Sequence, residues 1–298
     1  MSIQTPATTL NRIKRRAKII ARLEQIQHVY ALDKAAQEAG FRNFNHARNV
    51  IEATIPASLP IMPTHYVTLS AYWRDYDVGV SGRETLRIPL KRPWTELIRK
   101  PQFDNCQGLY GFDLVDGSNH PEHLGNWQNI SASGARRRVC AAARTLAFID
   151  ATGLRPSSAF RRAFPSDYFE YGIRIPGQDH ATVWFDPSNR RYLIANEPYE
   201  AAAESRRSRG EQEQQQWCEK YGYDTTKAPW LGMYNPDGGT HLYLFSHKNK
   251  GIALEPVIAA LAQLAPPLVE ADWTGGSTQN TFPPRVRRIV EPIEDGSI

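Results

Sequence analysis

The sequence predicts an α+β fold, in which an N-terminal three-helix unit of helix-turn-helix type precedes a mainly antiparallel sheet domain with helices. Three observations support this prediction. Apolar side chains recur every three or four positions within the first 55 residues, as they do in amphipathic helices. From residue 65 onward they recur at every second position among β-branched and aromatic residues, as in strands. Between these two patterns, residues 56–63 contain three prolines, which is typical of a stiff linker.

These patterns divide the chain into four predicted segments. A basic three-helix domain spans residues 1–55, a Pro-rich linker 56–63, an α+β domain 64–268 and a mobile C-terminal tail 269–298. At 298 residues the chain is long enough to bury a substantial core. Its content of 41% hydrophobic and 10% aromatic residues is that of a folded protein.

Each predicted helix of the head has start or stop signals. The first runs from about residue 9 to 27 and carries one apolar stripe, formed by Leu10, Ile13, Ala17, Ile20, Leu23 and Ile26. The second spans 30–39 and stops at Gly40, because glycine adopts a left-handed C-terminal conformation without steric cost. The third begins at Asn43 or Asn45 and stops at Pro56.

In the body, alternation predicts strands at 65–73, 79–89 (interrupted by a turn), 107–115, 180–185, 191–195 and 241–246. Helical periodicity predicts helices at 94–99, 131–151, 156–163, 200–221 and 255–264. Residues 116–129 are predicted to form a polar loop. In the helix at 131–151 we expect Val139, Leu146 and Ile149 to face the core, and the arginines, including Arg144, to lie largely elsewhere.

The cellular setting is predicted from what the sequence lacks. No apolar run approaches the roughly 20 residues that cross a bilayer, and no secretory signal precedes the basic cluster. Cys106, Cys140 and Cys218 are widely spaced and form no Cys-x-x-Cys pair or metal-ligand pattern. We therefore expect a cytoplasmic protein without membrane contacts, in which Cys140 is a small buried residue on a helix.

The excess positive charge lies entirely in the head. Residues 1–55 hold nine Lys/Arg and four Asp/Glu, whereas the other 243 residues hold 27 of each, so the whole net charge of +5 belongs to the head. Such asymmetry favours a polyanion-binding element. The residues predicted to hold phosphates are Arg12, Lys14, Arg15, Lys18 and Arg22.

Residues 30–51 are similar in pattern to a helix-turn-helix DNA reader, with a glycine in the turn and basic and amide side chains on the last helix. The residues expected to approach a DNA groove are Arg42, Asn43, Asn45, Arg48 and Asn49. One departure is His46, since that position usually holds a buried aliphatic residue. Either the turn differs in length, with Ala47 or Val50 as the anchor, or the head is an ordinary three-helix bundle.

The head also resembles a known family. Gly40, Phe41, Asn43 and Phe44 match a Gly-Phe-x-Asn-Phe/Trp core in a small helical segment at the start of many uncharacterised bacterial proteins. The chain as a whole resembles a proteobacterial family of unknown function associated with plasmids and integrative conjugative elements. The resemblance implies a mobile-element setting and brings no catalytic residues.

From these observations we expect a non-enzymatic accessory protein that binds nucleic acid through its head and a protein partner or second copy through its body. No cofactor, metal site or catalytic centre is predicted, because no P-loop, dinucleotide fingerprint, GxSxG or HExxH motif occurs.

Two alternatives from other classes remain open. In the first, the head is a protein-docking module, as in an antitoxin or a secretion adaptor. In the second, the body is a metal-dependent nuclease or a toxin-like hydrolase.

The body offers three weaker candidate sites. Carboxylates for a magnesium-dependent nuclease cluster at Asp75, Asp77, Asp104, Asp113 and Asp116. His120 and His123 have a spacing seen among metal ligands. Aromatic residues of the strands could stack bases on an exposed sheet face; these are Tyr66, Tyr72, Trp73, Trp184, Phe185, Tyr192, Tyr243 and Phe245.

Overall fold

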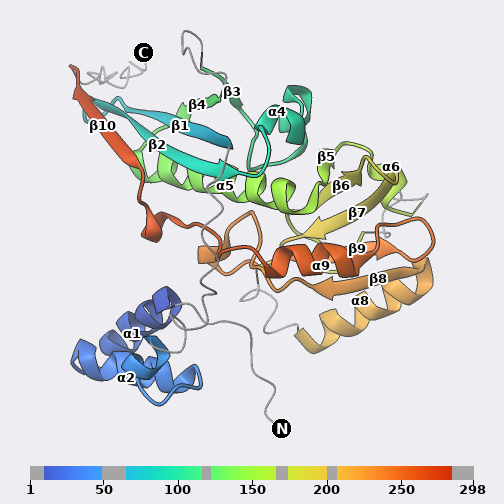
Figure 1. The fold of residues 1–298 in the computed structure, drawn as a ribbon, viewed down its shortest axis with the longest axis horizontal. Helices are drawn as coiled ribbons and strands as arrows, with labels where there is room; N and C mark the ends of the chain where they lie inside the picture. The colour runs from blue at the N-terminus through green and yellow to red at the C-terminus, as the bar shows by residue number, and fades with distance from the viewer. Residues whose placement is uncertain (1–9, 49–64, 116–121, 166–173, 200–206, 284–298) are drawn as a thin grey trace, which may run out of the picture. The chain divides into compact units, whose positions relative to one another are not determined.

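The computed structural model describes residues 10–48, 65–115, 122–165, 174–199 and 207–283 (Figure 1). The chain separates into two compact units, residues 1–62 and 63–298, which we call the head and the body. Both helices and antiparallel-rich sheets are present, so the predicted α+β class is confirmed.

The head contains α1 (Leu10–Glu24), α2 (His28–Glu38) and a third helix that begins at residue 44. Its core is small and alanine-rich, formed by Ile13, Ala17, Ile20, Ala31, Ala35, Ala36 and Ala47. Gly40 ends α2 at φ +88°, as predicted. Leu23 was expected in the core but is 76% exposed, because 100° per residue places it about a quarter turn from the line of Ile13 and Ala17.

The first sheet of the body, sheet A, has the strand order β10-β2-β1-β4-β3. Its strands are β1 (His65–Asp75), β2 (Val80–Leu90), β3 (Phe112–Leu114), β4 (His123–Asn129) and β10 (Gly276–Thr281). Only the β1–β4 pair is parallel. This arrangement corrects four predictions: β2 has no internal turn, the strand predicted at 107–115 is confined to β3, β4 lies in the predicted polar loop, and β10 lies in the predicted mobile tail.

The second sheet, sheet B, has the order β5-β6-β7-β9-β8. Its strands are β5 (Arg155–Ser157), β6 (Thr182–Asp186), β7 (Arg191–Asn196), β8 (Tyr223–Lys227) and β9 (Tyr243–His247). The hairpin predicted over 180–195 is confirmed as β6 and β7. β8 was not predicted, and the start of the helix predicted at 156–163 is instead part of β5, so that only α6 (Phe160–Ala163) is helical there.

The helix α5 (Ala132–Thr152) packs between the two sheets (Figure 1). Ser131 caps its start by accepting a hydrogen bond from the Gly134 N–H, and Gly153 ends it at φ +71°. The remaining helices are α4 (Trp94–Leu97), α6 (Phe160–Ala163), α8 (Arg207–Tyr221) and α9 (Leu254–Ala262), with 3-10 turns at Lys100–Asn105, Pro236–Gly238 and Glu270–Asp272.

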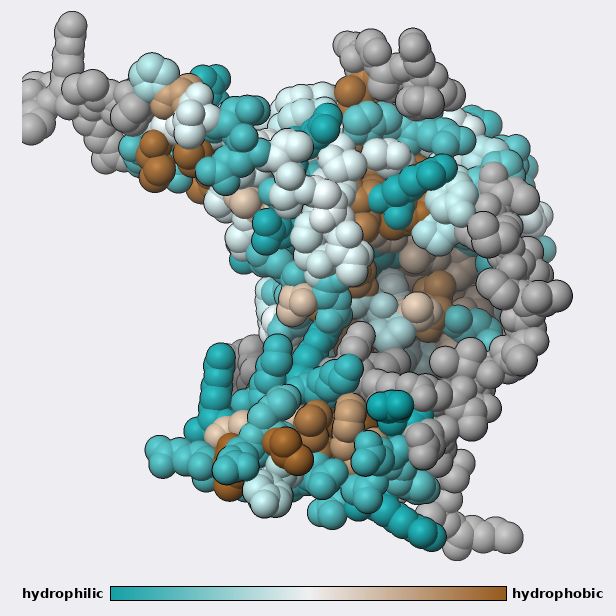
Figure 2. Space-filling view, turned by 60° about the vertical axis from the view of Figure 1, so that its left-hand side comes forward, coloured by the Kyte–Doolittle hydropathy of each residue, from teal (hydrophilic) through white to brown (hydrophobic). Residues whose placement is uncertain are grey.

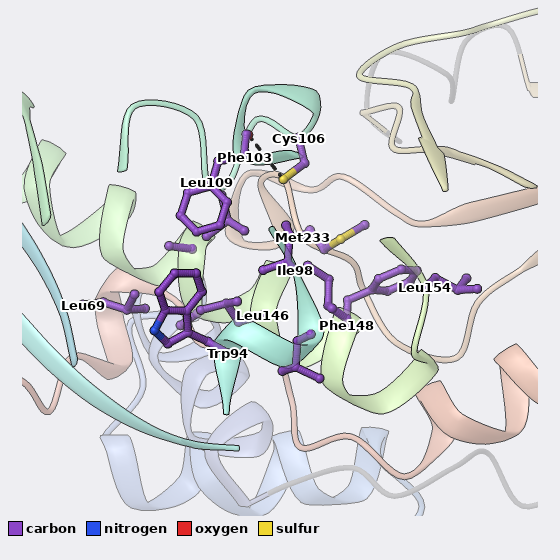
Figure 3. Packing of buried hydrophobic residues seen from close by; sticks show 14 of the residues in the cluster. Leu69, Trp94, Ile98, Phe103, Cys106, Leu109, Leu146, Phe148, Leu154 and Met233 are labelled. Carbon is purple, nitrogen blue, oxygen red and sulfur yellow. Dashed lines mark hydrogen bonds between the residues drawn. The ribbon is translucent and has the colours of Figure 1, made fainter. Parts of the chain in front are cut away.

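The main core fills the space around α5. Figure 3 shows Trp94 beside Phe103, Leu69 and Leu146, so α4, sheet A and α5 meet in one cluster. On the other side of α5, Phe148 packs on Trp184 of sheet B with ring centroids 4.4 Å apart. The far face of sheet B is covered by α8 through Trp217 and Cys218.

The prediction for Cys140 is confirmed, since it is buried on α5, and burial raises the pKa of its thiol to about 11. Arg144 lies outside the apolar stripe of α5, as expected, but it is buried. Its guanidinium is enclosed because it donates hydrogen bonds to the loop carbonyls of Met233, Tyr234 and Leu268. Within the described residues, no helix is both long and apolar enough to cross a membrane.

Candidate nucleic-acid interface

The side of sheet A that faces away from α5, here called the open face, combines aromatic and basic side chains. Alternation along β1 directs Val67, Leu69 and Ala71 toward α5, and therefore places Tyr72 and Arg74 on the open face. The antiparallel register sets Arg83 of β2 directly opposite Tyr72. Cross-strand neighbours of this kind lie within contact distance, so the ring and the guanidinium share one surface.

A groove of about 690 Å³ runs along this face. It is lined by Tyr72, Trp73, Arg74, Tyr76, Ser81, Gly82, Arg83, Trp127, Asn129, Thr278 and Asn280. The lining residues come from β1, β2, β4 and β10 and from the turn after β1. The groove therefore depends on two strands, β4 and β10, that the sequence did not predict.

A stacked aromatic pair forms one wall of the groove. The rings of Tyr72 and Trp127 are parallel to within 2°, with centroids 5.3 Å apart, and Trp127 is 52% exposed. Gly125 allows this arrangement, because a Cβ at that position would lie 2.7 Å from the Trp127 ring. The result is a flat, solvent-accessible indole held in a fixed orientation by the strand and by Tyr72.

Two arginines of the open face, Arg74 and Arg87, lie against aromatic rings. The Arg74 guanidinium is 4.1 Å from the ring centroid of Phe282 and 4.8 Å from that of Tyr76. Arg87 lies 4.0 Å from the centroid of Tyr66. Such contacts orient the guanidinium and leave its edge able to bind an anion.

Arg83 and Glu84 are neighbours on β2 but face opposite sides of the sheet. The buried Nε of Arg83 has no hydrogen-bond acceptor among the described residues. Glu84 is buried on the α5 side, where it accepts hydrogen bonds from Arg136 at 2.9 Å and from Ser277. The adjacent acid therefore does not neutralise the guanidinium in the groove.

In the head, the predicted phosphate contacts lie on one side of α1. Arg15, Lys18 and Arg22 are exposed and lie on the side of α1 opposite the core residues Ile13, Ala17 and Ile20, and the exposed Lys14 lies at the border of that side. Arg16, in contrast, is paired with Glu38 at 2.7 Å. Arg12 lies in α1, but its side chain is outside those that the structure describes.

The residues predicted to approach a DNA groove do not all remain available. Asn43 accepts a hydrogen bond from the His46 N–H at 2.8 Å, so its side-chain oxygen caps the third helix. Arg42, Asn45 and Arg48 are exposed, and Asn49 lies outside the described residues. Ala47 is fully buried and His46 only partly, so Ala47 rather than His46 packs in the core of the head; Val50, the other anchor considered, lies outside the described residues.

The candidate metal sites of the body have local explanations. Asp75 accepts hydrogen bonds from the backbone N–H groups of Asp77 and Val78, which is ordinary turn chemistry. Asp113 lies 3.3 Å from Lys100, and His123 is bonded to Ser70 at 2.8 Å. Among the described residues no three His, Cys, Asp or Glu side chains could hold one ion; His120 and Asp116 lie outside them.

The aromatic residues considered for base stacking are divided between the open face and the interior. Tyr66 and Tyr72 lie on the open face, whereas Trp73, Trp184 and Phe245 are buried. Trp127, the more exposed ring of the groove's stacked pair, was not predicted from the sequence. The signal that could have found it is the Gly125-x-Trp127 spacing, which predicts a ring lying over the glycine of the same strand face.

No protein-family model, no curated protein and no solved structure matches this chain.

Proposed function

We propose that this protein binds single-stranded nucleic acid on the open face of sheet A, with the basic side of α1 as a second contact for phosphates. The observation that carries the proposal is the exposed Tyr72–Trp127 stack in a groove that also contains Arg74 and Arg83. Proteins that bind single strands combine these two elements, since aromatic rings stack on bases and cations bind the backbone.

The geometry favours a single strand over a duplex. A base can stack on Trp127 only if one of its faces is free, and in a duplex both faces are covered by neighbouring base pairs. The groove also offers hydroxyl and amide groups from Ser81, Thr278 and Asn280, which suit hydrogen bonds to base edges or sugars. The head contributes charge without base recognition, because Lys14, Lys18 and Arg22 are long cationic side chains on a convex helix surface.

A second candidate function is protein docking through the head. Ile19, Leu23, Val29 and Tyr30 are all about half exposed or more, from 49% to 76%. In Figure 2 the head, in the lower part of the view, shows brown apolar side chains among teal polar ones. An exposed apolar cluster of this kind marks interaction surfaces in soluble proteins, so a protein partner for the head remains the alternative.

The proposal is tested with the full chain and a fluorescently labelled single-stranded oligonucleotide, by anisotropy. Replacing Trp127 with Ala removes the stacking surface, and stacking contributes about 1–3 kcal/mol per base, so we expect affinity to fall about 5- to 150-fold. The matched control is Tyr110→Ala, because Tyr110 is 53% exposed but does not line the groove. Equal affinities for the two variants, or tighter binding of a duplex of the same length, would refute the proposal.

The charges are tested by salt dependence. Arg83→Gln is compared with Arg92→Gln, which removes the same charge from an exposed position outside the groove. For a single strand each lost phosphate contact lowers the slope of log affinity against log salt by about 0.7. We expect that change for Arg83→Gln and for Lys18→Gln, and none for Arg92→Gln.

A further inference from the structure

One edge of sheet A is an exposed and uncharged strand. β10 stands at the end of the strand order, and all six of its residues are exposed (Figure 1). It pairs with β2 in an unbroken antiparallel register, from Gly276 opposite Thr85 to Thr281 opposite Val80. The strand contains neither a charged residue nor a proline. Its outer side is therefore a flat, polar stretch of backbone.

The other sheet edges of the described body are protected against strand addition. β3 has only three residues, one of which is Asp113. β5 is equally short and includes Pro156. β8 carries exposed charges at Asp224 and Lys227. Short strands, prolines and charges are the devices by which proteins prevent pairing at a sheet edge, and among the described edge strands β10 is the one that lacks them.

The backbone of β10 offers donors and acceptors on its free side. The Phe282 N–H donates to the carbonyl of Gly79 at 2.7 Å, which continues the β10–β2 ladder by one residue. In an antiparallel pair alternate residues bond to the same neighbour, so Thr278 and Asn280 also bond toward β2. The residues whose N–H and C=O groups point outward are therefore Ser277, Gln279 and Thr281.

These outward groups match a second copy of the same strand. If two copies of β10 meet antiparallel about a two-fold axis at Gln279, the two Gln279 residues exchange hydrogen bonds with each other. Ser277 of each copy then pairs with Thr281 of the second copy, so every outward backbone group of the three residues has a partner. The side chains allow this pairing, because hydroxyl and amide groups both donate and accept and no like charges meet.

We propose that two copies of this chain associate edge to edge through β10, about a two-fold axis at Gln279, and so extend sheet A from one copy into the other. The partner is a second copy because this contact satisfies the donors and acceptors of β10 with its own, and two-fold dimers are the commonest closed assemblies. An edge of six residues is smaller than a standard interface of roughly 1,200–2,000 Å², so we expect a dimer that dissociates on dilution.

The dimer has a consequence for the groove of the open face. Thr278 and Asn280 line this groove. A two-fold axis perpendicular to the sheet keeps the open faces of both copies on the same side, and it sets Thr278 of one copy opposite Asn280 of the second. The two grooves therefore meet at the interface. The use of this longer surface by one nucleic-acid strand rests on the proposed function, whereas the dimer itself does not.

The test is sedimentation velocity of the full chain, without nucleic acid, over a series of protein concentrations. We expect the average sedimentation coefficient to rise from that of a monomer toward that of a dimer. Gln279→Lys and Gln279→Glu each set like charges opposite one another at the axis, which should weaken the dimer by up to about fivefold. An equal mixture of the two variants sets opposite charges there and should restore the association.

Gln279→Pro removes an outward N–H that β2 does not use, so this variant should remain folded by circular dichroism. It should nevertheless weaken the dimer about fivefold or more, because each copy loses a hydrogen bond. The control is Gln216→Lys, which adds the same charge as Gln279→Lys at an exposed position of α8 and should leave association unchanged.

A monomer at every concentration up to millimolar would overturn the proposal. So would Gln279 variants that all dimerise as the wild type does. Because nucleic acid is absent from the experiment, its failure and the failure of oligonucleotide binding are separate results.

Discussion

The buried carboxyl of Glu197 should make the stability of the body depend on pH in an unusual direction. Burial raises the pKa of Glu197 from 4.5 to about 7, and hydrogen bonds from Tyr234 and Met233 and the charge of Arg144 only partly oppose this. An acid with a raised folded-state pKa holds a proton that the unfolded chain releases. Folding is therefore favoured at low pH, and this contribution is lost as the pH rises from 4.5 to about 7.

The size of the effect follows from the shift. A difference of about 2.5 pKa units corresponds to about 3 kcal/mol, most of it between about pH 5 and pH 8. Glu197→Gln keeps an oxygen that can accept from Met233 and Tyr234 but cannot titrate. We therefore expect the variant to be about as stable as the wild type toward pH 5, where the carboxyl is neutral like the amide, and to be more stable by up to about 3 kcal/mol near pH 8, where the wild type must bury a carboxylate.

Urea denaturation followed by tryptophan fluorescence at several pH values measures this difference. The difference between the two curves isolates Glu197, because all the other titrating groups are common to both proteins. Parallel curves would show that the carboxylate is already ionised in the folded protein throughout this range, and the argument from burial would then be wrong.

Three further substitutions test the packing. Arg144→Met leaves three buried carbonyl acceptors without their donor, so unfolding in urea should require at least about 3 kcal/mol less free energy. Gly232→Ala should destabilise the body more than Gly153→Ala. Both glycines have positive φ, +110° and +71°, but a Cβ at Gly232 would lie 2.4 Å from a Glu197 oxygen, whereas a Cβ at Gly153 would contact no atom within 4 Å. Thermal melts of the two variants give the comparison. Asn43→Ala removes the cap of the third helix and should lower the stability of the head by about 1 kcal/mol. The expected result is a lower melting temperature of the helical circular-dichroism signal of the head. An unchanged melting temperature would mean that the cap contributes nothing.

Elements with strong local signals were predicted well from the sequence. The helix α5 has a serine cap, a long apolar stripe and a terminal glycine, and the hairpin of β6 and β7 has alternation on both sides of a polar turn. Both patterns arise from interactions within a few residues, so a single sequence reveals them. The missed strands, β4, β5, β8 and β10, have little alternation of apolar residues. Backbone pairing with strands that are distant in sequence holds them in place.

The candidate sites were harder to predict for the same reason. Trp127 lies in a segment that reads as a polar loop, and its role emerges only when β4 aligns with β1 and places it on Tyr72. Glu197 and Arg144 act on the same peptides from opposite sides, although they are 53 positions apart in the chain. The basic character of the head, by contrast, is a matter of composition and was visible at once.

The pairing of β10 with β2 has a consequence for how the protein is made. Ser277 and Glu84, joined across these strands, are separated by 193 positions, so the outer edge of sheet A stays open during synthesis until almost all the body has emerged. Until then β2 presents unpaired backbone groups that can recruit another chain. A polypeptide that ends just before residue 276 should therefore be prone to aggregation. It would also lack Thr278 and Asn280, which complete the groove.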